Sequence, residues 1–285
     1  MGRLDSCAEI LAAHQRAGRH LCVGLDTDFE HLPASVLPFG SVDERVVAFN
    51  REIVDRTAEI ACAFKPNAAF YEALGECGFR ALAGTIAAIK ERAPDVPVIL
   101  DAKRADIGST NRGYAAAAFD RLGADALTVH PYLGGEALSP FLERAEKLLF
   151  VLARTSNPGA GEFQDLLVDG LPLYRRVARS VALDWNRAGN CGLVVGATYA
   201  DELAAVRAEI PVSVPILVPG IGAQGGDLAA VVEAHTRVGS SAFLLNASRS
   251  ILFASDGADF ADAAGAEAQR LHLAIRAQLD ATQAP

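Results

Sequence analysis

Eight short runs rich in Val, Ile, Leu or Phe recur along the chain, and they constrain the fold more than any other feature. Runs of this length, bounded by Gly, Pro or Asp, are typical of buried β-strands. They cover residues 20–26, 61–65, 96–103, 126–130, 148–155, 192–196, 214–219 and 241–246. We therefore predict eight strands distributed over most of the 285 residues.

Helical patterns lie between these runs. Ser41 and Glu44 have the spacing of a capping box, which begins a helix. The apolar stripe that follows consists of Val46, Val47, Phe49, Ile53 and Val54. A second helix is predicted to open at Pro172, which a first turn tolerates, and to be closed by Gly189. An alanine-rich segment, residues 258–279, predicts a last outer helix.

Strands that alternate with helices form right-handed βαβ units and a parallel sheet. Eight such units predict an α/β fold of the TIM (β/α)8 barrel type, whose functional residues lie at the C-terminal ends of the strands. The alternative, a doubly wound open sheet, usually has a Gly-rich turn after its first strand. Here that turn contains Asp26, Thr27 and Asp28. We therefore favour the barrel, as a single domain of residues 1–285.

Composition and charge argue against several classes of protein. Hydrophobic residues make up 51% and charged residues 21%, which favours a large core over disorder. The net charge of −9 is opposite to the basic surface of a nucleic-acid-binding protein. The longest apolar run, residues 148–153, is too short to span a membrane. Five cysteines without paired spacing indicate reduced thiols, so we predict a cytoplasmic protein.

The third predicted strand ends in a cluster of charges that carries the main functional signal. Strand residues two apart share a face, so Asp101 and Lys103 should point the same way, and Asp106 follows in the loop. A lysine between two carboxylates stays protonated, which suits it to donate a proton to a carbanion. Lys65 ends the second strand and Asp26 the first. Each charge alone could mark where a strand reaches water, but together they favour one functional network.

A phosphate site is predicted at the last two strands. Residues 219–227, after the seventh strand, are Gly-rich and lead into a helical segment at 228–235. Glycines let backbone N–H groups approach a ligand, and a helix N-terminus favours an anion. Arg249, after the eighth strand, can hold a phosphate through two parallel hydrogen bonds. Barrels commonly bind phosphate at these two loops, although a Gly-rich turn can also be only a turn.

Four segments, in order, resemble the orotidine 5′-phosphate decarboxylase family in its longer bacterial subgroup. They read FKPNAAFYE, LDAKRADIGSTN, ARTSNPGAGEFQ and VPGIGAQGGD, and the resemblance extends from Gly24 to Ser250. It implies a barrel carboxy-lyase that converts orotidine 5′-phosphate to UMP and CO₂ in de novo pyrimidine biosynthesis, without metal or cofactor. It also implies a homodimer with shared active sites.

The same resemblance implies roles for individual residues. Lys103 would protonate C6 of the pyrimidine, and Asp101 would lie beside the substrate carboxylate. Lys65 would link the ribose to Asp101, and Asp26 would bind a ribose hydroxyl. Asp106, with Ile107 and Thr110 nearby, would reach into the neighbouring subunit's site. Ser156 would contact the pyrimidine edge, and Arg249 would bind the phosphate. Gln224 would bridge the pyrimidine edge and the phosphate. Gly108 stands where the family often has Pro, and Ser248 stands where the family commonly has Gly. The resemblance therefore does not fix the backbone geometry of these two loops.

Two other functions compete with this interpretation. A magnesium-dependent sugar-phosphate lyase or synthase of the same barrel superfamily would share the D-x-K-x-x-D strand, but it would carry a metal-binding Glu where this chain has Lys65. A non-catalytic nucleotide-binding barrel would gain little from Asp101 facing an anionic ligand. Loss of activity in EDTA would favour the first alternative, and UMP binding without turnover would favour the second.

Overall fold

The computed structural model describes residues 6–36, 38, 40–220 and 227–283. Its centre is a sheet of parallel strands at all the predicted places, with bounds that differ by a few residues. These strands are β1 (Leu21–Leu25), β2 (Ala61–Pro66), β3 (Ile99–Arg104), β4 (Ala126–Val129), β5 (Leu148–Arg154), β8 (Cys191–Val195), β9 (Ile216–Pro219) and β10 (Phe243–Ala247).

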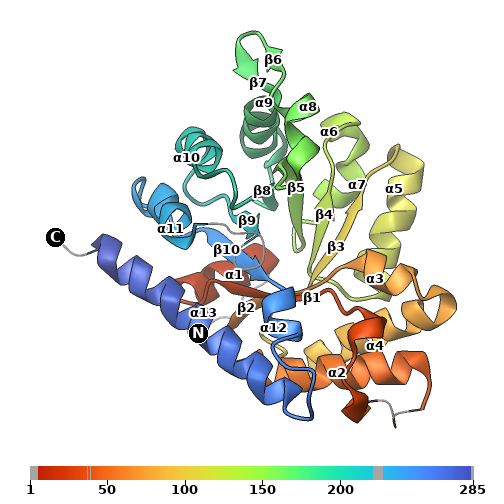
Figure 1. The fold of residues 1–285 in the computed structure, drawn as a ribbon. Helices are drawn as coiled ribbons and strands as arrows, with labels where there is room; N and C mark the ends of the chain where they lie inside the picture. Colours follow the sequence, from red (N-terminus) through yellow and green to blue (C-terminus); the bar gives the residue numbers. More distant parts are fainter. Residues whose placement is uncertain (1–5, 37, 39, 221–226, 284–285) are drawn as a thin grey trace.

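The sheet closes on itself (Figure 1). The hydrogen-bonded strand order is β2-β1-β10-β9-β8-β5-β4-β3. The two outermost strands then meet through parallel bridges between Phe64 and Val98 and between Asn67 and Asp101. The prediction of a TIM (β/α)8 barrel is confirmed, and the open sheet that competed with it is wrong.

Helices surround the barrel, most of them between consecutive strands, with α1 before the first strand and α12 and α13 after the last. The longer ones are α1 (Cys7–Arg16), α2 (Val42–Thr57), α4 (Gly75–Arg92), α10 (Ala200–Glu209), α11 (Leu228–Thr236) and α13 (Phe260–Gln283). The shorter ones are α3 (Ala68–Glu72), α5 (Gly108–Ala115), α6 (Gly134–Ala137), α7 (Ser139–Leu142), α8 (Gly161–Gln164), α9 (Leu173–Arg179) and α12 (Arg249–Leu252). Within the described ranges, no helix is both long enough and apolar enough to cross a membrane.

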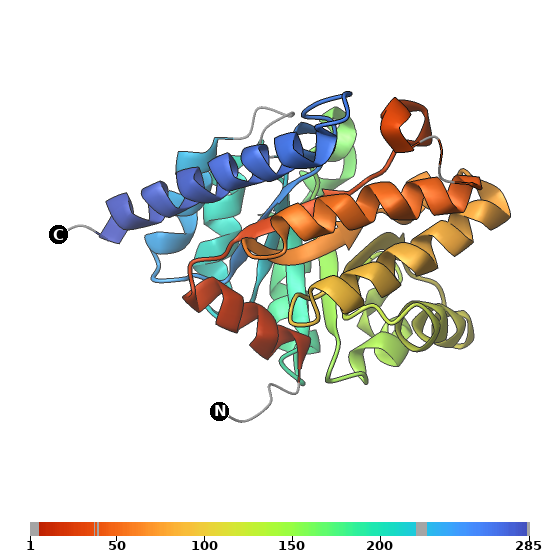
Figure 2. The same cartoon turned by 90° about the horizontal axis from the view of Figure 1, so that it is seen from below.

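The outer helices pack through the apolar stripes that the sequence predicts. The capping box at α2 is confirmed, with the backbone N–H of Ser41 donating to Glu44 Oε2 over 2.7 Å. Phe49 and Ile53 of its stripe are fully buried. Figure 2 shows α13, α2 and α4 side by side along the outside of the barrel. The apolar residues that recur at helical spacing in these three segments lie on the faces that the helices bury.

The region after β5 differs most from the prediction. The loop contains a small antiparallel hairpin, β6 (Leu167–Val168) and β7 (Leu171–Pro172), which projects from the barrel in Figure 1. Its turn is Asp169–Gly170, and both residues have positive φ values, as a tight hairpin turn needs. Pro172 precedes α9 by one residue, and a π-helix at Ser180–Trp185 follows directly. The helix therefore ends before Gly189.

The barrel interior is a packed core below the rim. Inward-pointing side chains from different strands form one apolar cluster, and Cys7 and Leu11 of α1 pack against it from the N-terminal end of the barrel. The strand residues of this cluster are Cys22, Cys62, Ala63, Ile99, Ala126, Leu148, Phe150, Val194, Leu217 and Leu244. The polar rim therefore rests on a closed apolar base.

Gly78 allows α3 and α4 to approach closely. A Cβ atom at this position would lie 1.7 Å from the backbone oxygen of Tyr71. Gly78→Ala should lower the free energy of unfolding by about 2 kcal/mol or more, because backbone must shift to relieve the clash. Gly113→Ala in α5 is the matched control, since its Cβ meets nothing within 4 Å and Ala favours the helix. Chemical unfolding of both variants tests this, and equal stability would contradict it.

Candidate active site

The polar rim of the barrel follows from strand periodicity. Ala63, Ile99 and Ala126 point into the apolar base of the barrel. The residues two positions further along the same strands point the same way and lie one layer nearer the C-terminal ends. These residues are Lys65, Asp101 and Thr128. Three neighbouring strands thus bring an ammonium group, a carboxylate and a hydroxyl to one place.

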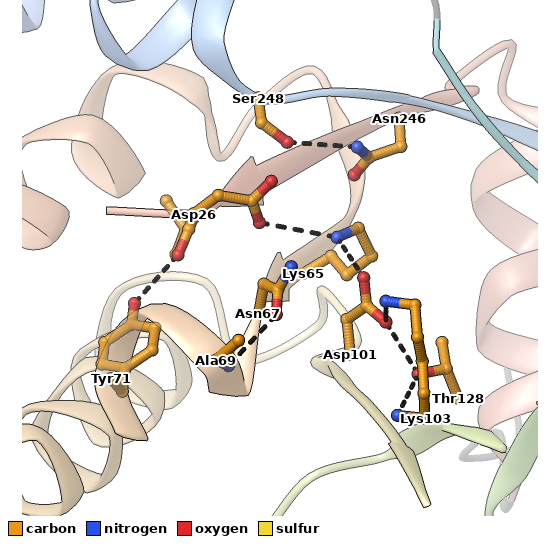
Figure 3. A network of polar contacts seen from close by, with 11 residues as sticks. Asp26, Lys65, Asn67, Ala69, Tyr71, Asp101, Lys103, Thr128, Asn246 and Ser248 are labelled. Carbon is orange, nitrogen blue, oxygen red and sulfur yellow. Dashed lines mark hydrogen bonds and ion pairs between the residues drawn. The ribbon is translucent and has the colours of Figure 1, made fainter. Parts of the chain in front are cut away.

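Asp101 is the centre of this layer, and Figure 3 shows the groups around it. Its Oδ2 accepts a hydrogen bond from Lys65 Nζ over 2.9 Å. Its Oδ1 accepts from Lys103 Nζ over 2.7 Å and from Thr128 Oγ1 over 2.8 Å. The side chain is only 11% exposed. Two cations and a hydroxyl therefore replace the water that a carboxylate normally needs.

Lys65 lies between two carboxylates. Its Nζ is 2.9 Å from Asp101 Oδ2 and 3.6 Å from Asp26 Oδ1, and its side chain is 4% exposed. Burial alone would lower the pKa of this lysine, but the charges of Asp101 and Asp26 outweigh burial and raise it. Burial would likewise raise the pKa of Asp101, and the charges of Lys65 and Lys103 lower it instead. Both groups are held in their charged forms.

Lys103 has an unusual backbone for a lysine. Its φ angle is +47°, in the left-handed region, and the pairing of β3 with β4 shifts register between Leu100 and Arg104. The backbone N–H of Lys103 donates to Thr128 Oγ1 over 3.0 Å. A non-glycine residue in this region costs on the order of 1 kcal/mol or more. The irregularity places Nζ on Asp101 while leaving the side chain half exposed.

Four of the five predicted charged residues form the expected network, and Asp106 stands apart in the described chain. Its Oδ1 accepts from the backbone N–H of Ile107 over 2.6 Å, and its own N–H donates to the buried Asn111. The lysine between two carboxylates within the described chain is thus Lys65, whereas the ammonium group of Lys103 pairs with the carboxylate of Asp101 and not with that of Asp106. Ile107 and Thr110 are exposed beside Asp106.

A cavity of about 340 Å³ opens above this network. Its lining includes Lys65, Asp101, Lys103 and Thr128 and, from the loop after β5, Ser156 with its two neighbours, Thr155 and Asn157. The remaining lining residues are Leu152, Val194, Leu217 and Pro219. The charged groups therefore face an apolar wall, where electrostatic interactions are stronger than in water.

The predicted phosphate residues are placed only in part. Arg249 begins α12 with an exposed side chain. Gln224 lies outside the described residues, as do the glycines at 222, 225 and 226. Asp227 caps the N-terminus of α11, because its Oδ1 accepts from the N–H of Ala230 over 3.1 Å. A carboxylate therefore already satisfies one of the N–H groups that were predicted to favour an anion.

The departures from the family pattern fit their surroundings. Ser248 lies against Gly24 of β1, where a Cβ atom would come within 2.0 Å of the Ser248 Oγ. Asn246 Nδ2 donates to the same Oγ over 3.2 Å. Gly108 begins α5, and a Cβ atom at this position would meet nothing within 4 Å. The missing side chain at Gly24 thus makes room for the extra atoms of Ser248.

Comparison with known proteins agrees with this geometry. A family model described as "Orotidine 5'-phosphate decarboxylase / HUMPS family" matches residues 19–264. The chain belongs to this family. An orotidine 5′-phosphate decarboxylase from Herpetosiphon aurantiacus is 52% identical over 250 residues, which cover 87% of this chain and 90% of the relative.

Solved structures of the family share the fold. The OMP decarboxylase of Leishmania donovani superposes with a TM-score of 0.79 at 39% identity, covering 94% of this chain and 97% of that one. The UMP synthase of the same organism gives a TM-score of 0.82 at 39% identity. There the match covers 96% of this chain but 57% of the longer synthase chain.

The sequence patterns missed two polar contributors to this family site. Thr128 accepts from the Lys103 backbone and donates to Asp101, yet it stands inside an apolar run without any charge. Its position two residues beyond the inward-facing Ala126 was the available signal. Gln164 lies nine residues beyond Thr155 and bonds to it twice, which no local spacing rule indicates.

Asp101→Asn should lower the free energy of unfolding by about 3 kcal/mol at neutral pH, because Lys65 then loses its nearest carboxylate. The folded-state pKa of Asp101 lies below its ordinary value of 3.8. Its contribution to stability is therefore present above about pH 4 and lost as the pH falls toward the folded-state pKa. The difference between wild type and variant should shrink below about pH 4.

Urea unfolding at neutral and acidic pH measures both effects. Asp120→Asn is the control, because Asp120 pairs with Arg144 at the exposed surface. Its effect should be much smaller at every pH. A neutral-pH loss no larger than that of the control, or one unchanged by acid, would contradict the role of Asp101.

Proposed function

We propose that this chain is an orotidine 5′-phosphate decarboxylase, converting orotidine 5′-phosphate to UMP and CO₂ as the final step of de novo pyrimidine synthesis. Two relatives with that name match this chain over most of their own length. The observation that supports it most directly is the ammonium group of Lys103, which is anchored on the buried Asp101 and exposed to the cavity. That arrangement supplies a proton where negative charge develops.

The proposed reaction moves one proton and one electron pair. The bond between C6 and the carboxylate breaks, CO₂ leaves, and the electron pair stays on C6. The ammonium of Lys103 stabilises this charge and then donates a proton to C6, giving UMP; water reprotonates the lysine. Because Asp101 and Lys65 fix the cation before the reaction, little reorganisation is needed in the transition state.

The other proposed contacts surround this centre. Asp26 would bind a ribose hydroxyl, and Lys65 would connect the ribose with Asp101. Ser156, which lines the cavity from the loop after β5, would contact the pyrimidine edge. Arg249, with its exposed side chain, would bind the phosphate, and Gln224 would bridge phosphate and pyrimidine.

Lys103→Ala should leave the fold intact and reduce turnover by several orders of magnitude, because it removes the proton donor and the cation aimed at C6. The fall in orotidine 5′-phosphate absorbance measures turnover, and circular dichroism checks the fold. Near wild-type decarboxylation by this variant would overturn the assignment.

The same assay discriminates the alternative functions. A magnesium-dependent lyase needs carboxylates where β2 ends, but the buried ammonium of Lys65 occupies this position and repels a cation. Among the described residues, no cluster of three His, Cys, Asp or Glu side chains could hold a metal ion. Decarboxylation that persists in EDTA supports the proposal, and activity abolished by EDTA would favour the lyase.

A homodimer with shared active sites is the second part of the proposal. Asp106 is oriented by Asn111 and Ile107 but does not contact Lys103 in its own chain. Large apolar side chains are exposed in the adjoining loops, with Ile107 60% and Tyr132 94% accessible. Such side chains favour burial against a second subunit, which would carry Asp106 to the neighbouring site.

Co-expression of Lys103→Ala with Asp106→Ala tests site sharing. If Asp106 serves the neighbouring subunit, each mixed dimer has one intact site, although both parent variants are impaired. Random mixing makes half of the dimers mixed, so activity should recover to about a quarter of wild type. Size-exclusion chromatography establishes the dimer. No recovery in a mixed dimer would place Asp106 in its own subunit's site or outside any site.

The proposed location is the cytoplasm. All five cysteines are free, and all but Cys77 are buried. Burial raises the pKa of the Cys22 thiol to about 12, which keeps it protonated and unreactive.

A further inference from the structure

Arg154 is a buried cation that has no role in the proposed reaction. It is the last residue of β5 and is 2% exposed. A guanidinium group cannot discard its charge, so burying it is costly unless several partners compensate. The partners of Arg154 come from the loop after β5 and from the loop after β8, at the rim of the barrel.

The guanidinium group joins two loops. Its Nη1 donates to Gln164 Oε1 and its Nη2 donates to Asp165 Oδ2, each over 3.2 Å. Its Cζ also lies 4.1 Å from the ring centroid of Tyr199, in the loop after β8. A planar fork can bond two acceptors and stack on a ring at once, which a lysine cannot do.

Gln164 connects Arg154 with Thr155, which lines the cavity. Its Oε1 accepts from the backbone N–H of Thr155 over 2.9 Å, and its Nε2 donates to Thr155 Oγ1 over 2.8 Å. Thr155 Oγ1 in turn donates to Asn157 Oδ1 over 2.7 Å. Both neighbours of Ser156 are therefore held by a chain of hydrogen bonds that begins at Arg154.

Ser156 is also fixed from the opposite side. Gly196, directly after β8, packs closely against Ser156. A Cβ atom at position 196 would lie only 2.8 Å from Ser156 Cβ. The N–H of Gly196 donates to the Arg154 backbone oxygen over 2.9 Å. Ser156 is thus confined between the β8 exit and the segment anchored by Gln164.

We propose that Arg154 and Gln164 are positioning residues that hold Ser156 in place for the pyrimidine ring. Neither contacts the cavity directly; both act through Thr155 and its neighbours. The proposal rests on the proposed function, because it assumes that the cavity receives a pyrimidine nucleotide. Small displacements of a binding group lower activity strongly, so losing this anchor should be costly.

A double-mutant cycle tests the proposal. Arg154→Met and Ser156→Ala should each reduce kcat/KM for orotidine 5′-phosphate by about tenfold or more, and the double variant should be little worse than either one. The dissociation constant for UMP, measured by calorimetry, should follow the same pattern. Additive losses in the double variant, or an unaffected Arg154→Met, would overturn the proposal.

Additional variants separate positioning from general destabilisation. Gln164→Ala, at a half-buried site, should fold normally and reproduce the coupling with Ser156→Ala. Glu162→Ala is the matched control, because Glu162 is an exposed residue in the same short helix and should change nothing. Arg154→Lys keeps the charge without the fork and should behave like Arg154→Met. Full rescue by lysine would show that charge alone matters and would overturn the proposal.

The two readouts distinguish the possible failures. If the wild type binds UMP but does not decarboxylate the substrate, the proposed function fails while the UMP cycle still decides the role of Arg154. If the wild type binds no UMP, both proposals fail. Arg154→Met combined with Arg249→Ala should give additive losses, because Arg249 is not among the residues that line the cavity with Ser156. Coupling between these two variants would contradict local positioning.

Discussion

The buried carboxylate of Asp101 is the interaction on which the rim of this barrel depends. A carboxylate removed from water needs compensating charge and hydrogen bonds, and here they come from Lys65, Lys103 and Thr128. Lys65 in turn is tolerated inside the barrel because Asp101 and Asp26 flank it. The three neighbouring strands are therefore joined at the rim by electrostatics as well as by their backbone ladders.

This mutual dependence reconciles an acidic chain with an anionic substrate. The formal charge of −9 is a sum over the whole surface, whereas the site depends on a few fixed groups. Lys65 and Lys103 both pair with carboxylates, Lys65 with Asp26 and Asp101 and Lys103 with Asp101. Lys103 nevertheless remains half exposed, and it lines a cavity that also has apolar lining residues. Its charge is therefore accessible to an anion in the cavity.

Sequence periodicity predicted the fold and most of the charged network. Apolar runs identified all eight barrel strands, and the charges at the ends of the first three runs located the rim. The register shift around Lys103 could not be predicted, because it depends on the pairing of β3 with β4 and on the hydroxyl of Thr128. The links of Arg154 were also inaccessible, since its partners lie 10, 11 and 45 residues away. The hairpin after β5 did have a signal, its Asp169–Gly170 turn.

The backbone of Lys103 sets a limit on how this barrel can be stabilised. A left-handed conformation is easiest for glycine and tolerable for asparagine, so the backbone strain at this position, taken alone, favours replacing the lysine. That change would relax the strand end and remove the cation from Asp101. Backbone strain and the ion pair with Asp101 thus oppose each other at a single residue, so a substitution chosen to relieve the strain would leave the buried carboxylate short of one cation.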